Sequence, residues 1–188
     1  GAGAMSYVTA VTRIDDELVE ILDVEKIFAE VVRLSTDVSR YIVDSGHALG
    51  TSRHVLVVDD SSVARAQIKR TLDQIGIPCT VVNNGVEGFK ILKKWVAEAD
   101  ERLAQLALVI SDIEMPEMDG YTLTSEIRRD PALVHLYVIL HTSLSGGFNN
   151  AMVEKVGANR FIAKFDADEL ATAVMERITG LAQSMKAA

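Results

Sequence analysis

Acidic residues stand at the ends of two apolar stretches of this chain. Asp59 and Asp60 come directly after Val55–Val58. Asp112 closes a second apolar run, Leu106–Ile110, after one intervening serine. Short uninterrupted apolar runs are typical of strands buried on both faces of a parallel sheet. Because ligands and chemistry collect at the carboxyl ends of strands in open α/β sheets, we expect the three carboxylates to meet there.

A cluster of this kind favours a divalent cation. Three carboxylates within about 4–6 Å of one another would repel by several kcal/mol for each close pair at an effective dielectric constant of about 20. They stay ionised only beside a cation, and oxygen ligands of this kind suit Mg²⁺ or Mn²⁺. Each acid also has a plain structural interpretation, with Asp112 as a solvated loop residue and Asp59 and Asp60 as a turn that caps the next helix.

Further polar groups are predicted at the same edge. Thr142 and Ser143 follow the run Leu136–His141, and Lys164 follows Arg160–Ala163. Alone, the hydroxyls would begin a loop and the ammonium would be a solvated charge. Together with the acids they form the set that phosphoryl transfer requires: a nucleophile, a metal site, and hydrogen-bonding and cationic groups for the phosphoryl oxygens.

The pattern after residue 53 predicts the elements that position these groups. Five apolar strands alternate with five helical segments, which indicates an α/β fold with a parallel sheet wound on both faces. We expect a flavodoxin-like, doubly wound five-stranded sheet of order 2-1-3-4-5, in which the first and third strands are neighbours. The strands are expected at about residues 54–58, 79–82, 106–111, 136–141 and 160–163. The helices are expected at about residues 62–75, 85–102, 120–129, 146–156 and 167–183.

The first fifty residues predict an extension to this fold. Val8–Ile14 and Leu18–Leu22 are β-like runs that predict a hairpin. Apolar residues then recur at steps of three and four, which predicts one amphipathic helix over about residues 23–44. The hairpin and the helix both need a surface to pack against, because each is only marginally stable alone in water. We therefore divide the chain into an expression-vector remnant (1–5), the extension (6–44), a polar linker (45–53) and the α/β domain (54–185).

Composition excludes several classes of protein. The chain has 188 residues and a formal net charge of −8, which gives no support to a nucleic-acid-binding surface. No apolar run approaches the roughly 20 residues that cross a bilayer, so we expect no membrane insertion. The lone Cys79 lies among apolar neighbours and is expected to be a core thiol in a reducing compartment, which favours a cytoplasmic protein.

Residues 54–185 resemble the receiver domain of two-component response regulators. The resemblance rests on the residues at the strand ends and on Met115–Pro116 and Asp119–Gly120 in the loop after the third strand. It implies a signalling switch in which a histidine kinase and Mg²⁺ phosphorylate Asp112, the phosphoacceptor. It also implies that the protein is not an enzyme, beyond catalysing its own phosphorylation and dephosphorylation.

The same resemblance implies roles for the other site residues. The metal would be held by Asp60, Asp112, the backbone carbonyl of Glu114 and, through water, Asp59. Phosphoryl binding and switching would involve Thr142, Ser143, Lys164 and Phe161. One departure is Phe165, which follows Lys164 where receivers usually carry a proline, often in cis. This departure leaves open the direction in which the Lys164 side chain points.

The amino-terminal part resembles a second family. Tyr7–Phe28 looks like the end of a CheW-type coupling domain, in which two strands lead into a helix. A coupling domain followed by a receiver is similar to CheV-type chemotaxis proteins. The resemblance implies two partners in chemotaxis: a histidine kinase of the chemotaxis type, and the chemoreceptor–kinase array, reached through the coupling domain of the full-length protein. An incomplete coupling domain could also form a homodimer through this extension.

Three alternative functions remain at this stage. A pseudo-receiver would serve as an interaction module without phosphorylation, which the Lys164–Phe165 departure motivates. A hydrolase of the haloacid dehalogenase kind would also use Asp112, but its signature requires a second Asp where Glu114 stands, and no cap insertion is recognisable. A flavodoxin-like cofactor carrier shares the topology, yet no loop is an evident phosphate cradle.

Overall fold

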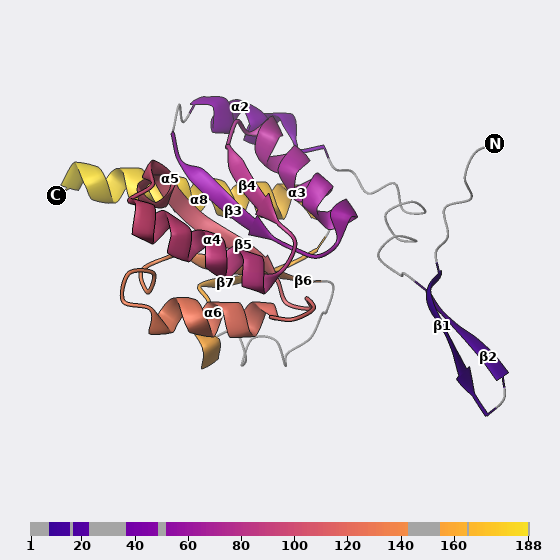
Figure 1. Ribbon diagram of the computed structural model, residues 1–188. Coiled ribbons are helices and arrows are strands. Elements are labelled where there is room, and N and C mark those ends of the chain that lie inside the picture. The colour runs from indigo at the N-terminus through magenta and orange to yellow at the C-terminus, as the bar shows by residue number, and fades with distance from the viewer. Residues whose placement is uncertain are drawn as a thin grey trace. The chain divides into compact units, whose positions relative to one another are not determined.

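The computed structural model describes residues 8–15, 17–22, 37–48, 52–142, 155–164 and 166–187. The chain divides into two units, Gly1–Ser35 and Thr36–Ala188. The smaller unit contains the predicted hairpin, formed by the antiparallel strands β1 (Val8–Ile14) and β2 (Glu17–Leu22) (Figure 1). Its turn passes through Asp15, whose φ of 48° lies in a left-handed region that Asp tolerates.

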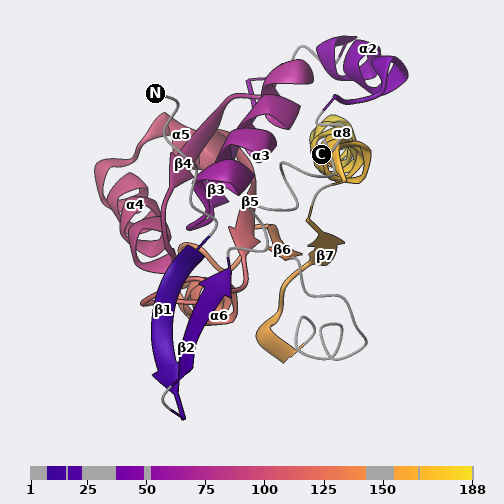
Figure 2. The same ribbon diagram turned by 90° about the vertical axis from the view of Figure 1, so that its right-hand side faces the viewer.

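The larger unit is built on a parallel five-stranded sheet of order β4-β3-β5-β6-β7. Its strands are β3 (His54–Val58), β4 (Cys79–Val82), β5 (Leu106–Asp112), β6 (Val138–Thr142) and β7 (Arg160–Ala163). Counted within this unit the order is 2-1-3-4-5, which confirms the predicted flavodoxin-like α/β fold. One face is covered by α3 (Ser62–Gln74) and α8 (Ala167–Ala187), and the other by α4 (Gly85–Glu98) and α6 (Gly120–Arg129) (Figures 1 and 2).

Side chains of the inner strand β3 alternate between two apolar cores. Val55 and Val57 face α3 and α8, whereas Leu56 and Val58 face α4 and α6. All four are fully buried, so both faces of the strand require apolar residues. The next residue is Asp59, and the first polar side chain therefore comes where the chain leaves the sheet.

Helices α4 and α6 begin with side-chain caps close to the carboxyl ends of the strands. Asn84 Oδ1 accepts a hydrogen bond from the backbone N–H of Glu87 at 2.8 Å. Asp119 Oδ1 accepts one from the backbone N–H of Thr122 at 2.6 Å. These caps satisfy donors that the first helical turn leaves unpaired. They keep the connections short and hold the strand-end side chains near one another.

The helix predicted for residues 23–44 differs from the structure in its described part. Residues 37–39 are not helical, and α2 (Arg40–Ala48) continues into the segment expected to be a linker. The cause is tertiary: the backbone N–H of Ser39 donates to Asp168 Oδ1 at 2.7 Å, and its hydroxyl binds the same carboxylate. Residues 23–36 lie outside the described residues.

Two other helices predicted from the sequence differ from the structure or lie mostly outside the described residues. The helix expected at 85–102 is divided into α4 and α5 (Glu101–Gln105), because Ala99 takes a left-handed φ of 49°. Most of the helix expected at 146–156 falls in residues 143–154, which are outside the described residues.

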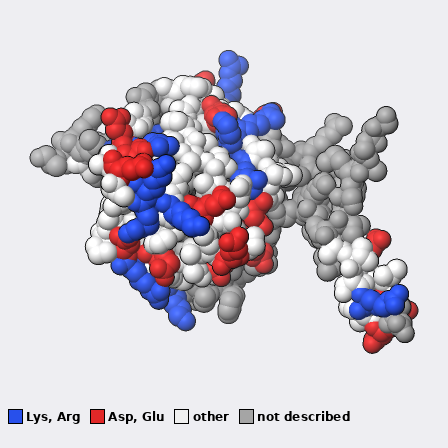
Figure 3. Space-filling view, viewed as in Figure 1, with Lys and Arg blue, Asp and Glu red and all other residues white. Residues whose placement is uncertain are grey.

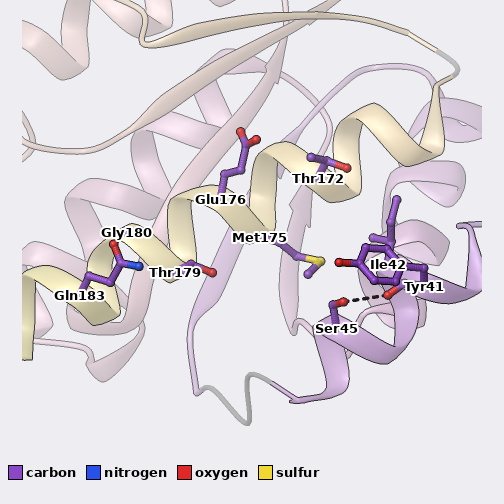
Figure 4. A pocket seen from close by; sticks show the side chains of 9 residues that line it. All are labelled: Tyr41, Ile42, Ser45, Thr172, Met175, Glu176, Thr179, Gly180 and Gln183. Carbon is purple, nitrogen blue, oxygen red and sulfur yellow. Dashed lines mark hydrogen bonds between the residues drawn. The ribbon is translucent and has the colours of Figure 1, made fainter.

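Helix α2 packs along α8 and leaves a shallow groove of about 470 Å³ between them (Figure 4). Tyr41, Ile42 and Ser45 line it from α2, and the Ser45 hydroxyl donates to the Tyr41 carbonyl at 2.8 Å. Val38, just before α2, is buried in the core beneath α3 and α8. The segment before β3 is therefore part of the larger unit.

Replacing Gly46 tests this docking of α2. A Cβ atom there would lie 2.8 Å from Ile75 Cβ and 2.9 Å from the Ile75 carbonyl oxygen. We expect Gly46→Ala to lower the free energy of unfolding in urea by about 1–3 kcal/mol, because helix and core must move apart. The control, Gly180→Ala, adds a Cβ that meets no atom within 4 Å and is expected to gain about 0.5–1 kcal/mol from helix propensity. A neutral or stabilising Gly46→Ala would contradict the packing described.

Candidate functional site

The carboxyl ends of β3 and β5 bring three acids together. The two strands are adjacent; Asp59 follows the last residue of β3, and Asp112 is the last residue of β5. One carboxylate oxygen from each of Asp59, Asp60 and Asp112 lies within 4.8 Å of the others. Asp59 and Asp112 are buried, and Asp60 is exposed. Figure 3 shows acidic side chains on the surface beside the start of α4.

Hydrogen bonds fix one oxygen of each buried carboxylate. Asp59 Oδ1 accepts from the backbone N–H of Ser61 at 2.8 Å, and the Asp59 carbonyl accepts from Arg65 Nη1 at 2.7 Å. Asp112 Oδ1 accepts from the backbone N–H of Ile113 at 2.7 Å. In both residues the second oxygen, Oδ2, is left to face a cation.

That cation is Lys164, which bridges the two carboxylates. Its Nζ lies 3.1 Å from Asp112 Oδ2 and 3.3 Å from Asp59 Oδ2, and its side chain is 1% exposed. Its backbone N–H donates to the Thr142 carbonyl at 2.9 Å and so pairs the ends of β6 and β7. One ammonium cannot balance two buried carboxylates and the nearby Asp60. The cluster therefore keeps an excess of negative charge that attracts a further cation.

The pKa of Asp112 shows how strongly burial disfavours its charged form. The pKa of its carboxyl is raised from 3.8 to about 7, mainly by burial and to a smaller extent by the nearby charge of Asp59. Lys164 opposes both effects without overcoming them. Near neutral pH a proton therefore competes with a metal ion for Asp112.

The loop after β5 passes very close to the strand end. The backbone N–H of Gly120 donates to the Ile113 carbonyl at 2.9 Å. A Cβ atom at Gly120 would lie 2.1 Å from the Asp112 carbonyl oxygen, so no other residue fits without moving the loop. Glu117 takes a φ of 65° in the same loop, which is costly for a residue other than glycine. The loop is therefore held tightly around Asp112.

The other residues predicted for the site lie in different places. Thr142 is the buried last residue of β6, and Glu114 is an exposed residue of the loop after β5. Phe161 packs into the core under α4 and α6, on the sheet face opposite Asp112. Ser143 and Phe165 lie outside the described residues.

Sequence reasoning missed two residues that the structure places at this site. Arg65 holds the Asp59 carbonyl from the first turn of α3, and His141 is buried beside Asp112 in the sheet. A signal existed for His141, since it is a polar residue directly after the apolar run Val138–Leu140. No signal distinguished Arg65 from a solvated helix residue.

Comparison with known proteins identifies the fold family. The family model described as the response regulator receiver domain matches residues 55–175. The chain belongs to this family. It is 30% identical over 164 residues to the chemotaxis protein CheV3 of Helicobacter pylori, a match that covers 86% of this chain and 52% of CheV3. It is 34% identical over 111 residues to CheY1 of the same organism, covering 58% of this chain and 83% of CheY1.

A solved receiver domain agrees with this assignment. The signal receiver domain of a signal transduction histidine kinase from Syntrophus aciditrophicus is 32% identical, with a TM-score of 0.59, over 69% of this chain and 92% of that one. The chain spans about half the length of the CheV relatives that it matches. Among the described residues, no helix has the length and apolarity needed to cross a membrane.

The acid cluster suits a hard divalent cation. Its ligand atoms are carboxylate oxygens within 4.8 Å of one another, as Mg²⁺ or Mn²⁺ requires. Within the ranges that the structure describes, no other group of three His, Cys, Asp or Glu side chains converges in this way. The cluster is therefore the candidate site for a divalent cation in this chain.

Proposed function

We propose that this receiver accepts a phosphoryl group on Asp112 from a histidine kinase, with Mg²⁺, and acts as a chemotaxis signalling switch. The observation that carries the proposal is the buried Asp112 carboxylate at the end of β5, 3.1 Å from Lys164 Nζ and beside Asp59 and Asp60. Phosphoryl transfer requires a nucleophile among groups that stabilise the charge of the phosphoryl oxygens.

The chain's own residues supply most of this chemistry. A carboxylate oxygen of Asp112 forms the new bond to phosphorus, and the bond from phosphorus to the donor's leaving group breaks with its electron pair. Asp60, Asp112 and the Glu114 carbonyl would hold the metal directly, and Asp59 through water. When bound, Mg²⁺ neutralises the charge of the acids and the phosphoryl oxygens. Lys164, already at Asp112, would turn to a phosphoryl oxygen.

The switch would act through the end of β6. Phosphorylation adds negative charge at Asp112, which the Thr142 hydroxyl and the Lys164 ammonium can meet only by changing their contacts. Leu140 of β6 pairs with Phe161 of β7, so a shift of β6 also moves the Phe161 ring. The free energy by which phosphorylation shifts the equilibrium between the two states is set by the difference in contacts between those states.

The chemotaxis assignment is supported by the relatives. CheV1, CheV2 and CheV3 match over 86–93% of this chain, a span longer than the receiver alone. Exposed apolar side chains on the hairpin, including Leu18 at 71%, favour its being the end of a larger coupling domain. Through that domain the full-length protein would contact a chemoreceptor–kinase array, and through the hairpin it could form a homodimer.

The test is phosphorylation by a small donor. We expect acetyl phosphate with Mg²⁺ to add one phosphoryl group, seen by intact mass, and EDTA to prevent the addition. Failure of the folded protein to bind Mg²⁺ or to form the adduct would contradict the proposal and favour a pseudo-receiver that acts by protein contacts alone.

A further inference from the structure

His141 is a buried imidazole between the phosphoacceptor strand and the lysine strand. It lies in β6, paired with Asp112 of β5 on one side and with Ile162 of β7 on the other. The residue is 4% exposed. Nothing in the phosphoryl chemistry described above uses this residue.

Strand alternation places the imidazole on the same face as the acceptor carboxylate. Ile110 and Ile139, two residues before Asp112 and His141, both belong to the core beneath α3 and α8. Side chains two residues apart on a strand point to the same face. Ile162 belongs to the same core, so His141 and both of its sheet neighbours share this face.

Lys164 must span the end of β6 to reach Asp112. Lys164 follows Ile162 by two residues and leaves the end of β7, whereas its ammonium contacts Asp112 on β5 and Asp59 beyond β3. Strand β6 lies between β7 and β5. The lysine side chain therefore crosses the carboxyl end of β6, on the face of the sheet that carries His141. The ammonium is near enough to help burial lower the pKa of His141 to about 3.

Packing alone does not account for an imidazole here. Its Nδ1 is buried and makes no hydrogen bond among the described residues. A buried polar atom without a partner costs free energy that an apolar side chain would not. The same-face neighbours Ile139 and Ile162 show that aliphatic groups fill this layer. The neutral ring does offer a nitrogen lone pair, which attracts an ammonium as a hydrocarbon cannot.

We propose that His141 is a positioning residue: its imidazole supports the Lys164 side chain across β6 and so sets the rates at which Asp112 gains and loses a phosphoryl group. This inference rests on the proposed function. His141 acts through Lys164 and does not itself touch the metal or the phosphoryl group.

The test compares His141→Leu with His141→Asn and with the neighbouring packing variant Ile162→Val. Rates of acetyl phosphate labelling and of adduct loss are measured at saturating Mg²⁺, together with the Kd for Mg²⁺ and the Tm. We expect His141→Leu to slow labelling by about five- to tenfold, with a Kd for Mg²⁺ within about twofold of the wild-type value. His141→Asn, whose amide keeps polar atoms near the position of Nδ1, is expected to recover most of the labelling rate.

The outcomes separate this inference from the proposed function. A wild-type protein that forms no adduct overturns the proposed function. If the wild type is labelled and His141→Leu has the same rates of labelling and of adduct loss, only the role of His141 is overturned. If Ile162→Val slows labelling as much as His141→Leu, the effect is one of packing and the inference is also wrong. If His141→Leu does not fold, the smaller apolar variant His141→Val replaces it in the comparison. Labelling slower than that of both His141→Asn and Ile162→Val supports the role, and labelling at their rate overturns it.

Discussion

Replacing Asp112 with Asn is expected to abolish the phosphoryl adduct that acetyl phosphate forms in the presence of Mg²⁺. The two side chains have the same shape, and Lys164 keeps its contact with Asp59 at 3.3 Å, so the fold is expected to persist. The amide is a poor nucleophile, and its lack of charge also weakens the metal site. Intact mass after incubation with the donor measures the result.

The matched control is Asp119→Asn in the loop that follows the acceptor. Asp119 is exposed, and its Oδ1 caps α6 by accepting from Thr122 N at 2.6 Å. Asn caps helices about as well as Asp, so this variant keeps the loop and is expected to be labelled like the wild type. Full labelling of Asp112→Asn would instead identify a different acceptor, with Asp60 the nearest exposed carboxylate.

The central part of the site could be predicted because strand burial makes it visible in the sequence. Val55–Val58 and Leu106–Ile110 are apolar throughout since helices cover both faces of β3 and β5. The acids stand at the carboxyl ends of the two strands, where the helices no longer cover the chain. The predicted strand order makes these two strand ends neighbours. The approach of Asp59, Asp60 and Asp112 follows from those two facts.

Contacts that depend on register or on tertiary packing could not be predicted. The position of His141 beside Asp112 depends on the pairing of β5 with β6, which no residue pattern specifies. The break at Ala99 has no Gly or Pro to mark it, and its left-handed φ of 49° opposes local preference. Helix α2 likewise begins where Ser39 binds α8 rather than where the apolar period begins.

Without metal, Asp112→Asn is also expected to stabilise the protein, by about 2–4 kcal/mol at pH 8. Folding raises the pKa of Asp112 from 3.8 to about 7. Between these two pH values the carboxyl is protonated in the folded state and ionised in the unfolded state. Stability is therefore lost as the pH rises from about 4 to about 7 and is constant above that range. Asn imitates the protonated carboxyl and escapes this loss, although it also removes one partner of Lys164.

The pH dependence distinguishes this effect from a change in packing. Urea unfolding of the metal-free proteins is expected to show the advantage of Asp112→Asn shrinking below pH 7 and vanishing near pH 4, while Asp119→Asn stays within about 0.5 kcal/mol of the wild type. Adding Mg²⁺ is expected to close the gap at pH 8 by stabilising only the protein that retains the carboxylate. An Asp112→Asn variant that is less stable at pH 8 would mean that Lys164 outweighs burial, and that the empty site holds its carboxylates without strain. The expected result would instead mean that the fold gives up stability at this strand end, and that cation binding or phosphorylation relieves the cost.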